Sequence, residues 1–554
     1  MEYIIVQAGG KGTRLGHLTR NKPKALLPVE NLPMLFHLFQ KYPDRRFIII
    51  ADYQKEALRE YLEAFADVRY QVVDAQGTGT CAGVREALSL IPERQPFLLI
   101  WSDLILPKDF RLPKEYEGSK REKERKTPYA DALMEVGGIS RDIDGKGRES
   151  CPQNDYIGIS TTFSCRWSYT EGAFKEEPSC EDGVAGFFLF SDKGKLQDVP
   201  ASGELVRWMQ GKGMRFQRIS LAGTREFGIL EEYERLECVK CRPFNRITIE
   251  GDVLVKEALD AQGDVLAKRE CAWYDKALSL AACKATAGQE GADSSGYCGC
   301  KEDLRAFLPE IYGREPLRME HVRGRILYEY RLDREGKREV LRELVSALDG
   351  LHALGKAPAD SFSMKEAYYR KTMDRLSQIE DLVPFARDRE ILINGKRCRN
   401  VFFHKRELEK RLEQLTCTQF SFIHGDCTFS NLMLREDGGP VLIDPRGYFG
   451  FTEFYGDVRY DWAKLYYSIV GNYDRFNLKE FRLDITGKGA ELEIASNQWE
   501  DMERDFFDLT GADEWEIRLL HAVIWLSLTT YAWQDYDSVC GAFYNGLYYL
   551  EDVL

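Results

Sequence analysis

Two stretches of the sequence carry the residue types that chemistry at phosphorus requires. The first is Gln7-Ala-Gly-Gly-Lys-Gly-Thr-Arg14, in which glycines alternate with cations. Glycines let backbone N–H groups approach phosphate oxygens that a Cβ atom would block, while Lys11, Arg14 and the later Lys24 supply positive charge. The pattern indicates a phosphate-binding loop, although a tight structural turn has the same composition. The candidate loop residues are Ala8, Gly9, Gly10, Lys11, Gly12 and Thr13.

The second stretch runs from His424-Gly-Asp426 to Asn431 and is followed by Val-Leu-Ile-Asp444. An acid, an amide five positions later and a second acid after a short apolar hairpin form the arrangement that a phosphoryl-transfer site needs. In such a site Asp426 accepts a hydroxyl proton, while Asn431 and Asp444 hold Mg²⁺ against the ATP phosphates. The alternative is a loop whose Asp and Asn side chains cap turns.

The elements around the first stretch alternate between strands and helices. Apolar runs at Tyr3–Val6, Phe47–Ala51, Tyr70–Val73 and Phe97–Trp101 predict strands, and Gln54–Phe65 predicts a helix between two of them. This βαβα order predicts a doubly wound, mostly parallel sheet with helices on both faces. Ligands are expected beyond the carboxyl ends of such strands, where the glycine-rich stretch follows the first strand.

The pattern changes near residue 240. Arg246–Lys256 alternates like a strand, Leu266–Lys276 is helix-like, and Ala281–Cys300 has the composition of a loop. Helical patterns dominate beyond Val340. We therefore expect an α/β domain at 1–240 and a two-lobed α+β domain at 241–554, with an N-lobe at 241–335 and a helical C-lobe at 336–554.

The first stretch resembles a family signature. Gly10-x-Gly12-Thr13-Arg14 followed by Pro23-Lys24 is similar to the signature of the sugar-phosphate nucleotidyltransferases, whose pyrimidine-type members include phosphocholine cytidylyltransferases. That family condenses a nucleoside triphosphate with a phosphomonoester on a Rossmann-like sheet and releases pyrophosphate. The resemblance implies that the loop holds the triphosphate and that Arg14 and Lys24 are catalytic residues.

Further residues match this family in order. Gln76 and Gly79-Thr80 resemble the base-contacting turn of members that use CTP or UTP. Asp103 resembles the first Mg²⁺ ligand, and Glu226 stands where the family usually has an Asp as the second.

The acceptor side departs from the family. Glu176-Glu177-Pro178 replaces the usual Glu-Lys-Pro, which removes a cation near the sugar phosphate. Arg166 and Glu176 are therefore candidate substrate residues. The alternative is that Trp167 packs in the core beside a surface arginine.

The second stretch resembles the aminoglycoside phosphotransferase and choline kinase superfamily, which has a protein-kinase-like fold. This resemblance implies that Asp426 is the catalytic base, that Asn431 and Asp444 bind metal, and that His424 orders the loop. Asp461 in Tyr-Asp-Trp-Ala-Lys is interpreted as a structural cap of the next helix.

Upstream residues extend the second resemblance. Lys256 is similar to the strand lysine that holds the ATP phosphates, and Glu270 is its candidate ion-pair partner. A salt bridge without function is the alternative for Glu270. Arg446, after Asp444, is not the usual residue and is a candidate substrate contact.

Together the two resemblances imply a bifunctional enzyme. A kinase step (EC 2.7.1 type) would phosphorylate a small hydroxylated metabolite with ATP. A nucleotidyltransferase step (EC 2.7.7 type) would then use CTP or UTP, with Mg²⁺ in both steps. The product would be a nucleoside-diphosphate-activated precursor for capsule, surface glycan or lipid decoration. The alternative is a regulatory protein that senses nucleotides and has one degenerate domain.

The sequence leaves the identity of the metabolite open: it could be a sugar, a polyol or a choline-like amino alcohol. A choline-like cation is expected to bind in an aromatic cage. The aromatic candidates near the C-terminus are Trp525, Tyr531, Trp533 and Tyr536.

Composition limits the partners. The 554 residues carry 77 Lys and Arg against 90 Asp and Glu, and a net charge of −13 disfavours nucleic acid and anionic membranes. We therefore expect only small molecules and nucleoside triphosphates as partners; the oligomeric state stays open. No apolar run approaches about 18 residues and no leader is evident, which predicts a cytoplasmic protein. Zinc binding by Cys238, Cys241, Cys298 and Cys300 also stays open.

Overall fold

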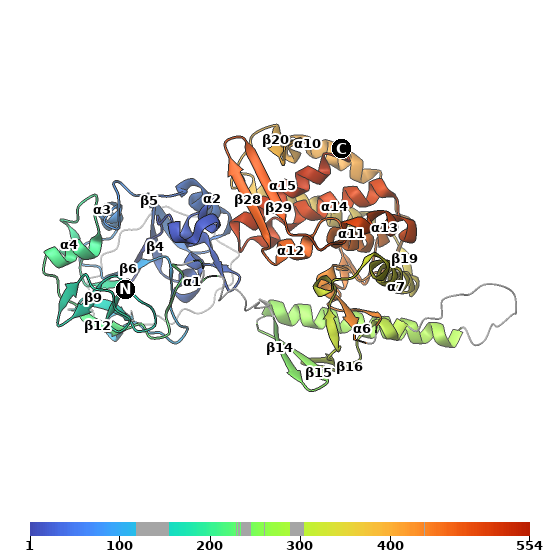
Figure 1. The fold of residues 1–554 in the computed structure, drawn as a ribbon, viewed down its shortest axis with the longest axis horizontal. Helices are drawn as coiled ribbons and strands as arrows, with labels where there is room; N and C mark the ends of the chain where they lie inside the picture. Colours follow the sequence, from blue (N-terminus) through green and yellow to red (C-terminus); the bar gives the residue numbers. More distant parts are fainter. Residues whose placement is uncertain are drawn as a thin grey trace, which may run out of the picture. The chain divides into compact units, whose positions relative to one another are not determined.

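The computed structural model describes residues 1–117, 154–228, 230, 233, 245–259, 261–287, 304–436 and 438–554. The chain divides into two compact units, Met1–Cys238 and Val239–Leu554. Figure 1 colours them along the chain from blue to teal and from green to red. The four cysteines considered for zinc lie outside the described residues.

A mixed sheet forms the centre of the N-terminal unit, and nine strands belong to it within the described residues. Its main path is β10 (Ala173–Lys175), β9 (Ser168–Thr170), β11 (Gly183–Phe190), β6 (Phe97–Trp101), β1 (Tyr3–Gln7), β4 (Arg46–Ala51) and β5 (Arg69–Asp74). Off this path, β8 (Tyr156–Ser160) pairs with β11, and β12 (Gln217–Ser220) pairs with β8. Strands β6, β1, β4 and β5 are parallel, which confirms the predicted βαβα core. Because β11 is antiparallel to both β6 and β8, the sheet as a whole is mixed.

Smaller elements complete this unit. They are helices α1 (Met34–Lys41), α2 (Lys55–Phe65), α3 (Val84–Ser89) and α4 (Leu205–Gly211), the paired strands β2 (Pro28–Val29) and β3 (Leu32–Pro33), and the paired strands β7 (Leu104–Ile105) and β13 (Arg225–Glu226). Ile4, Ile5 and Val6 of β1 are fully buried, as expected for a central strand covered on both faces. Gln7 pairs with Trp101, so the glycine-rich stretch and Asp103 leave the sheet at the same edge.

The first part of the C-terminal unit is an antiparallel sheet with a long helix. The order is β14 (Asn245–Glu250), β15 (Val253–Ala258), β17 (Leu317–Glu320) and β16 (Ile311–Arg314), followed in chain order after β15 by α6 (Ala261–Ala287). Two expectations were wrong here. The run expected as one strand is a hairpin because Gly251, with φ of 67°, reverses the chain. The expected loop from Ala281 begins as helix, because the alanine-rich start of that segment extends α6 to Ala287.

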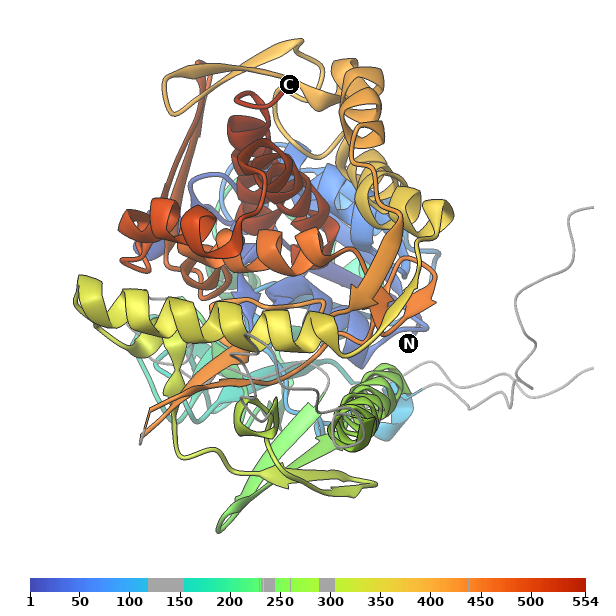
Figure 2. The same cartoon turned by 90° about the vertical axis from the view of Figure 1, so that its right-hand side faces the viewer.

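The rest of this unit is mostly helical. Its helices are α7 (Arg334–Ala353), α8 (Ser361–Lys365), α9 (Lys371–Ile379), α10 (Val401–Glu413), α11 (Val458–Ile469), α12 (Tyr473–Asn477), α13 (Glu503–Thr510), α14 (Glu514–Leu528) and α15 (Tyr536–Leu550). Its strand groups are β18 (Gly324–Ile326), β23 (Leu432–Arg435) and β24 (Pro440–Leu442); β19 (Lys356–Pro358), β22 (Gln419–Phe422) and β27 (Tyr455–Gly456); β20 (Glu390–Ile393), β21 (Lys396–Arg399), β28 (Phe481–Thr486) and β29 (Gly489–Ile494); and β25 (Tyr448–Phe449) with β26 (Thr452–Glu453). In the views of Figure 1 and Figure 2, α7 lies between the β14–β17 sheet and helices α14 and α15.

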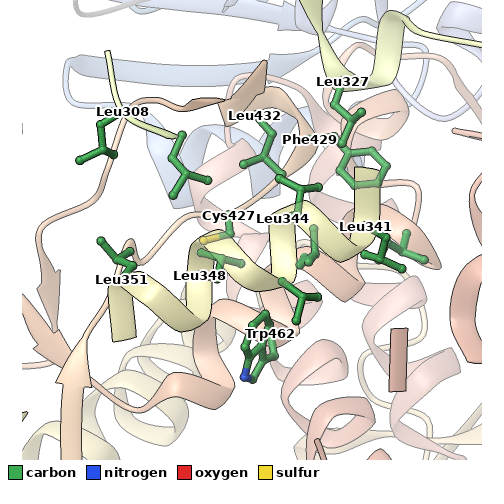
Figure 3. Packing of buried hydrophobic residues seen from close by; sticks show 14 of the residues in the cluster. Leu308, Leu327, Leu341, Leu344, Leu348, Leu351, Cys427, Phe429, Leu432 and Trp462 are labelled. Atoms are coloured by element: carbon green, nitrogen blue, oxygen red, sulfur yellow. The ribbon is translucent and has the colours of Figure 1, made fainter. Parts of the chain in front are cut away.

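Helix α7 organises the core of the second unit. Leu341, Leu344, Leu348 and Leu351 repeat at helical spacing and are all fully buried. They belong to one apolar cluster with residues of the second chemical stretch, including Phe429 (Figure 3). This packing fixes the strands that carry the candidate chemistry. Among the described helices, none is long and apolar enough to cross a lipid bilayer.

Candidate active sites

In the N-terminal unit a single lysine lies between the two predicted metal carboxylates. Lys24 Nζ is 2.5 Å from Asp103 Oδ2 and 4.0 Å from Glu226 Oε1. The pairing of β13 with β7 places Glu226 opposite Leu104, directly beside Asp103 in the chain. The longer side chain of Glu226 therefore still reaches the site that the sequence predicts for an Asp.

The two carboxylates fit a magnesium ion. Asp103 Oδ1 is buried and has no hydrogen-bond partner among the residues that the structure describes, so one oxygen of this carboxylate is available to a ligand. Mg²⁺ is usually bound by one or two carboxylates together with substrate phosphates. Such a site needs no larger cluster, and within the described residues no group of three or more His, Cys, Asp or Glu side chains could hold a metal.

The glycine-rich stretch lies beside the lysine and the arginine of this site. Gly12 adopts φ of 63°, which glycine adopts without strain, and the backbone N–H of Lys24 donates to the Gly10 carbonyl at 3.4 Å. A Cβ atom on Gly228 would lie 2.5 Å from Glu226 Oε1 and 3.2 Å from Arg14 Nη2. Because Gly228 has no Cβ atom, the side chains of Glu226 and Arg14 can both lie next to it. Around them, Ala8 is buried and Gly9 half-buried, whereas Gly10, Lys11, Thr13 and Arg14 are exposed.

The predicted base-contacting turn is held by the segment before α4. Gly79 has φ of 79°, and a Cβ atom there would lie 2.4 Å from the Gly203 carbonyl oxygen. Thr80 Oγ1 accepts a hydrogen bond from the Leu205 backbone N–H at 2.8 Å, so its hydroxyl also has a structural role. Gln76 is exposed beside this turn.

In the C-terminal unit Lys256 bridges two carboxylates. Its Nζ atom lies 2.5 Å from Glu270 Oε2 and 2.5 Å from Asp444 Oδ1. Burial alone would lower the pKa of Lys256, but the two carboxylates raise this pKa above its usual range. Burial followed by the charge of Asp444 raises the pKa of Glu270 to about 7. The pair expected from the sequence is therefore present and buried.

Asp426 lies in a polar network of its own. Asn431 Nδ2 donates to Asp426 Oδ2 at 3.0 Å, and Lys464 Nζ lies 2.9 Å from Asp426 Oδ1. Burial opposes ionisation, but Lys464 lowers the pKa of Asp426, so this carboxylate is ionised at neutral pH. An ionised carboxylate is the form that can accept a hydroxyl proton.

Asp461 holds the loop that carries Asp426. Its two oxygens accept from the backbone N–H groups of His424, at 2.9 Å, and Gly425, at 2.7 Å. The expectation that Asp461 caps the next helix was wrong: Asp457 is the N-cap of α11. Asp461 lies in the first turn of that helix, fully buried, and its side chain points to the loop.

Two family models match separate parts of the chain. The MobA-like NTP transferase domain matches residues 4–112, and the phosphotransferase enzyme family matches residues 259–484. The chain joins a nucleotidyltransferase domain to a phosphotransferase domain. Both folds expected from the sequence are thereby confirmed.

Known relatives are similar to parts of the chain. The bifunctional protein GlmU of Methanocaldococcus jannaschii is 23% identical over 264 residues, which are 46% of this chain and 60% of that protein. The chain thus spans less than two thirds of this relative. UTP–glucose-1-phosphate uridylyltransferase AglF of Haloferax volcanii is 26% identical over 193 residues, or 34% of this chain and 71% of that protein. The crystal structure of HddC from Yersinia pseudotuberculosis is 16% identical with a TM-score of 0.32, covering 43% of this chain and 98% of that one.

The acceptor candidates of the nucleotidyltransferase domain form a surface salt-bridge group. Arg166 and Arg207 both pair with Glu176, and the Arg207 contacts are 2.7 and 2.8 Å long. Trp167 is buried and donates its Nε1–H to Glu204 at 2.5 Å. The packing alternative therefore explains Trp167, and an acceptor role for Arg166 and Glu176 stays a prediction.

Several polar residues of the phosphotransferase domain were not found from the sequence. Lys464 follows Asp461 by three positions, but no spacing rule pointed to its contact with Asp426. Lys371 and Arg375 lie on α9 and belong to no recognised motif. Arg446 does lie in this region, where its two Nη atoms donate to the hydroxyls of Tyr460 and Tyr448 at 2.8 and 2.7 Å.

Proposed function

We propose that the chain is a bifunctional enzyme that makes a phosphomonoester and then activates it. The phosphotransferase domain, at about 241–554, would phosphorylate a small alcohol with ATP. The nucleotidyltransferase domain, at about 1–240, would join the product to CTP or UTP and release pyrophosphate. One observation carries the proposal: each domain gathers a lysine between two carboxylates at the place where its family is expected to bind nucleotide.

The residues of the nucleotidyltransferase domain can offset the negative charges that oppose the reaction. The phosphomonoester oxygen must approach an α-phosphorus that already carries negative oxygens. In this proposal Arg14 and Lys11 neutralise the triphosphate, and Lys24 orients the attacking phosphate. Asp103 and Glu226 would hold Mg²⁺, which when bound withdraws charge from the phosphates.

The residues of the phosphotransferase domain suit proton removal. Asp426, ionised beside Lys464, would accept the proton of the attacking hydroxyl. Lys256 would hold the α and β phosphates, with Glu270 keeping its ammonium in place. Asn431 and Asp444 would hold Mg²⁺; the Asn431 amide nitrogen already donates to Asp426, and its oxygen accepts no hydrogen bond from the described residues. The use of ATP and CTP or UTP makes the cytoplasm the proposed compartment, and the product would serve surface glycan or lipid decoration.

A coupled assay tests the proposal. The full chain is incubated with Mg²⁺, ATP, and CTP or UTP against a panel of sugars, polyols and amino alcohols, and ADP and pyrophosphate are both measured. Pyrophosphate release that depends on ATP and on one alcohol supports the sequence of two steps. Nucleotide binding without any turnover across the panel contradicts it and favours a nucleotide sensor.

A further inference from the structure

Four basic side chains form one group in the phosphotransferase domain, and one of them, Lys464, pairs with the proposed base Asp426. Lys371 and Arg375 come from α9, Arg446 from the loop after Asp444, and Lys464 from α11. Lys464 is paired with Asp426 at 2.9 Å. The charges of Lys464 and Arg446 act on Asp426, and those of Arg446, Arg375 and Lys464 act on Lys371, so the four lie in one electrostatic neighbourhood.

Three of these cations have no carboxylate within salt-bridge distance among the described residues. Arg446 is held by two tyrosine hydroxyls, and Arg375 by Ser527 through its hydroxyl, at 3.1 Å, and its carbonyl. The Lys371 side chain has neither a hydrogen bond nor an ion pair with any residue that the structure describes; its backbone N–H donates to the Glu366 carbonyl. Neutral oxygens solvate a cation without cancelling its charge, so this neighbourhood carries an excess of positive charge.

The charges of this group also act on Lys371. Burial, followed by the charges of Arg446, Arg375 and Lys464, lowers the pKa of Lys371 to about 6, and the charge of Glu366 opposes this only in part. A partly buried amine among three other cations is an unfavourable arrangement in the empty protein. The attraction of a bound anion to each of these cations would offset their mutual repulsion.

The backbone before Lys371 is also unusual. Residues Glu366–Arg370 form a π-helical turn between α8 and α9. Such turns are rare and occur frequently at functional sites. An extra residue in a helix rotates the next turn about the helix axis, and Lys371 and Arg375, four residues apart, then share one face of α9.

Three of the four aromatic residues considered for a choline-like cation do not offset this charge, and the fourth, Trp533, is half-buried. Trp525 and Tyr536 are buried in the core, and Trp525 donates to His521. Tyr531 is 61% exposed, but the Arg375 guanidinium already lies 5.9 Å from the centre of its ring. A cationic alcohol beside Asp426 would therefore meet other cations.

We propose that the alcohol phosphorylated at Asp426 carries an anionic group, a carboxylate or a phosphate, which Lys371, Arg375 and Arg446 bind. This inference rests on the proposed kinase function for the identity of the alcohol. The binding of the anion itself does not require turnover. Two experiments separate these parts.

The first experiment measures anion binding at Lys371. The full chain with saturating Mg²⁺ and ADP, which fill the proposed nucleotide site of the phosphotransferase domain, is acetylated with acetic anhydride, and the labelling rate of each lysine is read by peptide mass. We expect glycerate or inorganic phosphate to slow labelling of Lys371 at least about fivefold, whereas glycerol and choline leave it unchanged. Lys365, which is exposed and paired with Glu409 at 2.8 Å, is the internal control. Equal rates with every additive, or equal protection by choline, overturn the proposal.

The second experiment measures substrate preference. ADP release is compared for matched alcohols that differ in one group: glycerol, glycerate and glycerol 1-phosphate; glucose, glucuronate and glucose 1-phosphate; and choline. We expect kcat/KM at least about tenfold higher for a carboxylate or phosphate member than for its neutral partner, and the preferred member distinguishes the two anions. A preference for a neutral alcohol or for choline overturns the proposal.

Variants connect the two measurements to the named residues. Lys371→Met is expected to raise KM for the anionic alcohol about tenfold or more and to change KM for the neutral partner little, because a charged hydrogen bond is lost. Lys365→Met is the matched control. Equal effects of Lys371→Met on both alcohols count against anion binding. If no alcohol is phosphorylated, the kinase function fails, and the labelling result decides the anion site alone.

Discussion

Lys24 Nζ lies 2.5 Å from Asp103 Oδ2, although the two residues are 79 positions apart in the chain. The contact exists because β1 and β6 are parallel neighbours whose carboxyl ends open at one edge. The sequence motif thus delivers a cation to the end of one strand and a carboxylate to the end of the next. In the proposed reaction the same lysine orients an incoming phosphate.

Replacing Lys24 by methionine keeps most of its length and removes its charge. We expect kcat/KM for nucleotidyl transfer to fall about 100-fold or more, because one preformed electrostatic contact to the reacting phosphates is lost. Pyrophosphate release from a supplied phosphomonoester is the measurement. The exposed Lys175→Met is the control; a similar loss in both variants would contradict a specific role.

Gly228 provides a test that changes no charge. A methyl group there would lie 2.5 Å from Glu226 Oε1 and 3.2 Å from Arg14 Nη2, and both are ends of flexible side chains that can move aside. Gly228→Ala is therefore expected to retain the fold and to lower nucleotidyl transfer about tenfold by displacing Glu226. The control is Gly211→Ala, where a Cβ atom meets nothing within 4 Å. Unchanged activity in Gly228→Ala, measured at limiting Mg²⁺, would argue against Glu226 as a ligand.

The parts of this fold that the sequence predicted are those set by local pattern. Strand β1 and its parallel neighbours follow from apolar runs, because a central parallel strand is buried on both faces. The prediction of a single strand from Arg246 to Lys256 was wrong because one glycine with positive φ divides an otherwise regular alternation. The extension of α6 misled because alanine-rich segments suit both loops and helices.

The candidate sites divide in the same way. Asp426, Asn431 and Asp444 were predictable because their spacing along one hairpin is itself the motif. Lys464 and Lys371 come from other helices, and only tertiary packing brings Lys464 to Asp426 and Lys371 close enough to feel the charge of Lys464. No local pattern could show that Lys371 lacks an anionic partner among the described residues. The proposal of an anionic alcohol therefore depended on the structure.

Asp426→Asn tests whether the two sites are separable. The amide keeps the shape of the side chain but cannot accept the hydroxyl proton, so ADP release with the alcohol should fall at least about 100-fold. Pyrophosphate release from the supplied phosphomonoester should be unchanged, because that chemistry is assigned to the other domain. The control is Asp381→Asn, whose carboxylate is 77% exposed. Loss of both activities in Asp426→Asn would contradict independent sites.

His521 predicts a weakening of the second unit in mild acid. Its ring is buried on α14 and its Nε2 accepts the Trp525 Nε1–H at 3.0 Å, which requires the neutral form. Burial, followed by the charge of Arg518, lowers the pKa of His521 to about 3. The unfolded chain binds a proton below about pH 6.5 while the folded chain does not, so the stability is present above pH 6.5 and is lost as pH falls toward 3.

Between pH 7 and pH 5 this group should lower the free energy of opening by about 2 kcal/mol. Hydrogen exchange in peptides of α14, corrected for the intrinsic effect of pH, measures that free energy. His521→Gln keeps an acceptor for Trp525 but cannot take up a proton, so its pH dependence should be smaller than that of the wild type by this amount. The exposed His17→Gln should behave as the wild type. An identical pH dependence in His521→Gln and the wild type would show that His521 is not the group responsible. The reason is that glutamine cannot take up the proton that the His521 imidazole gains when α14 opens.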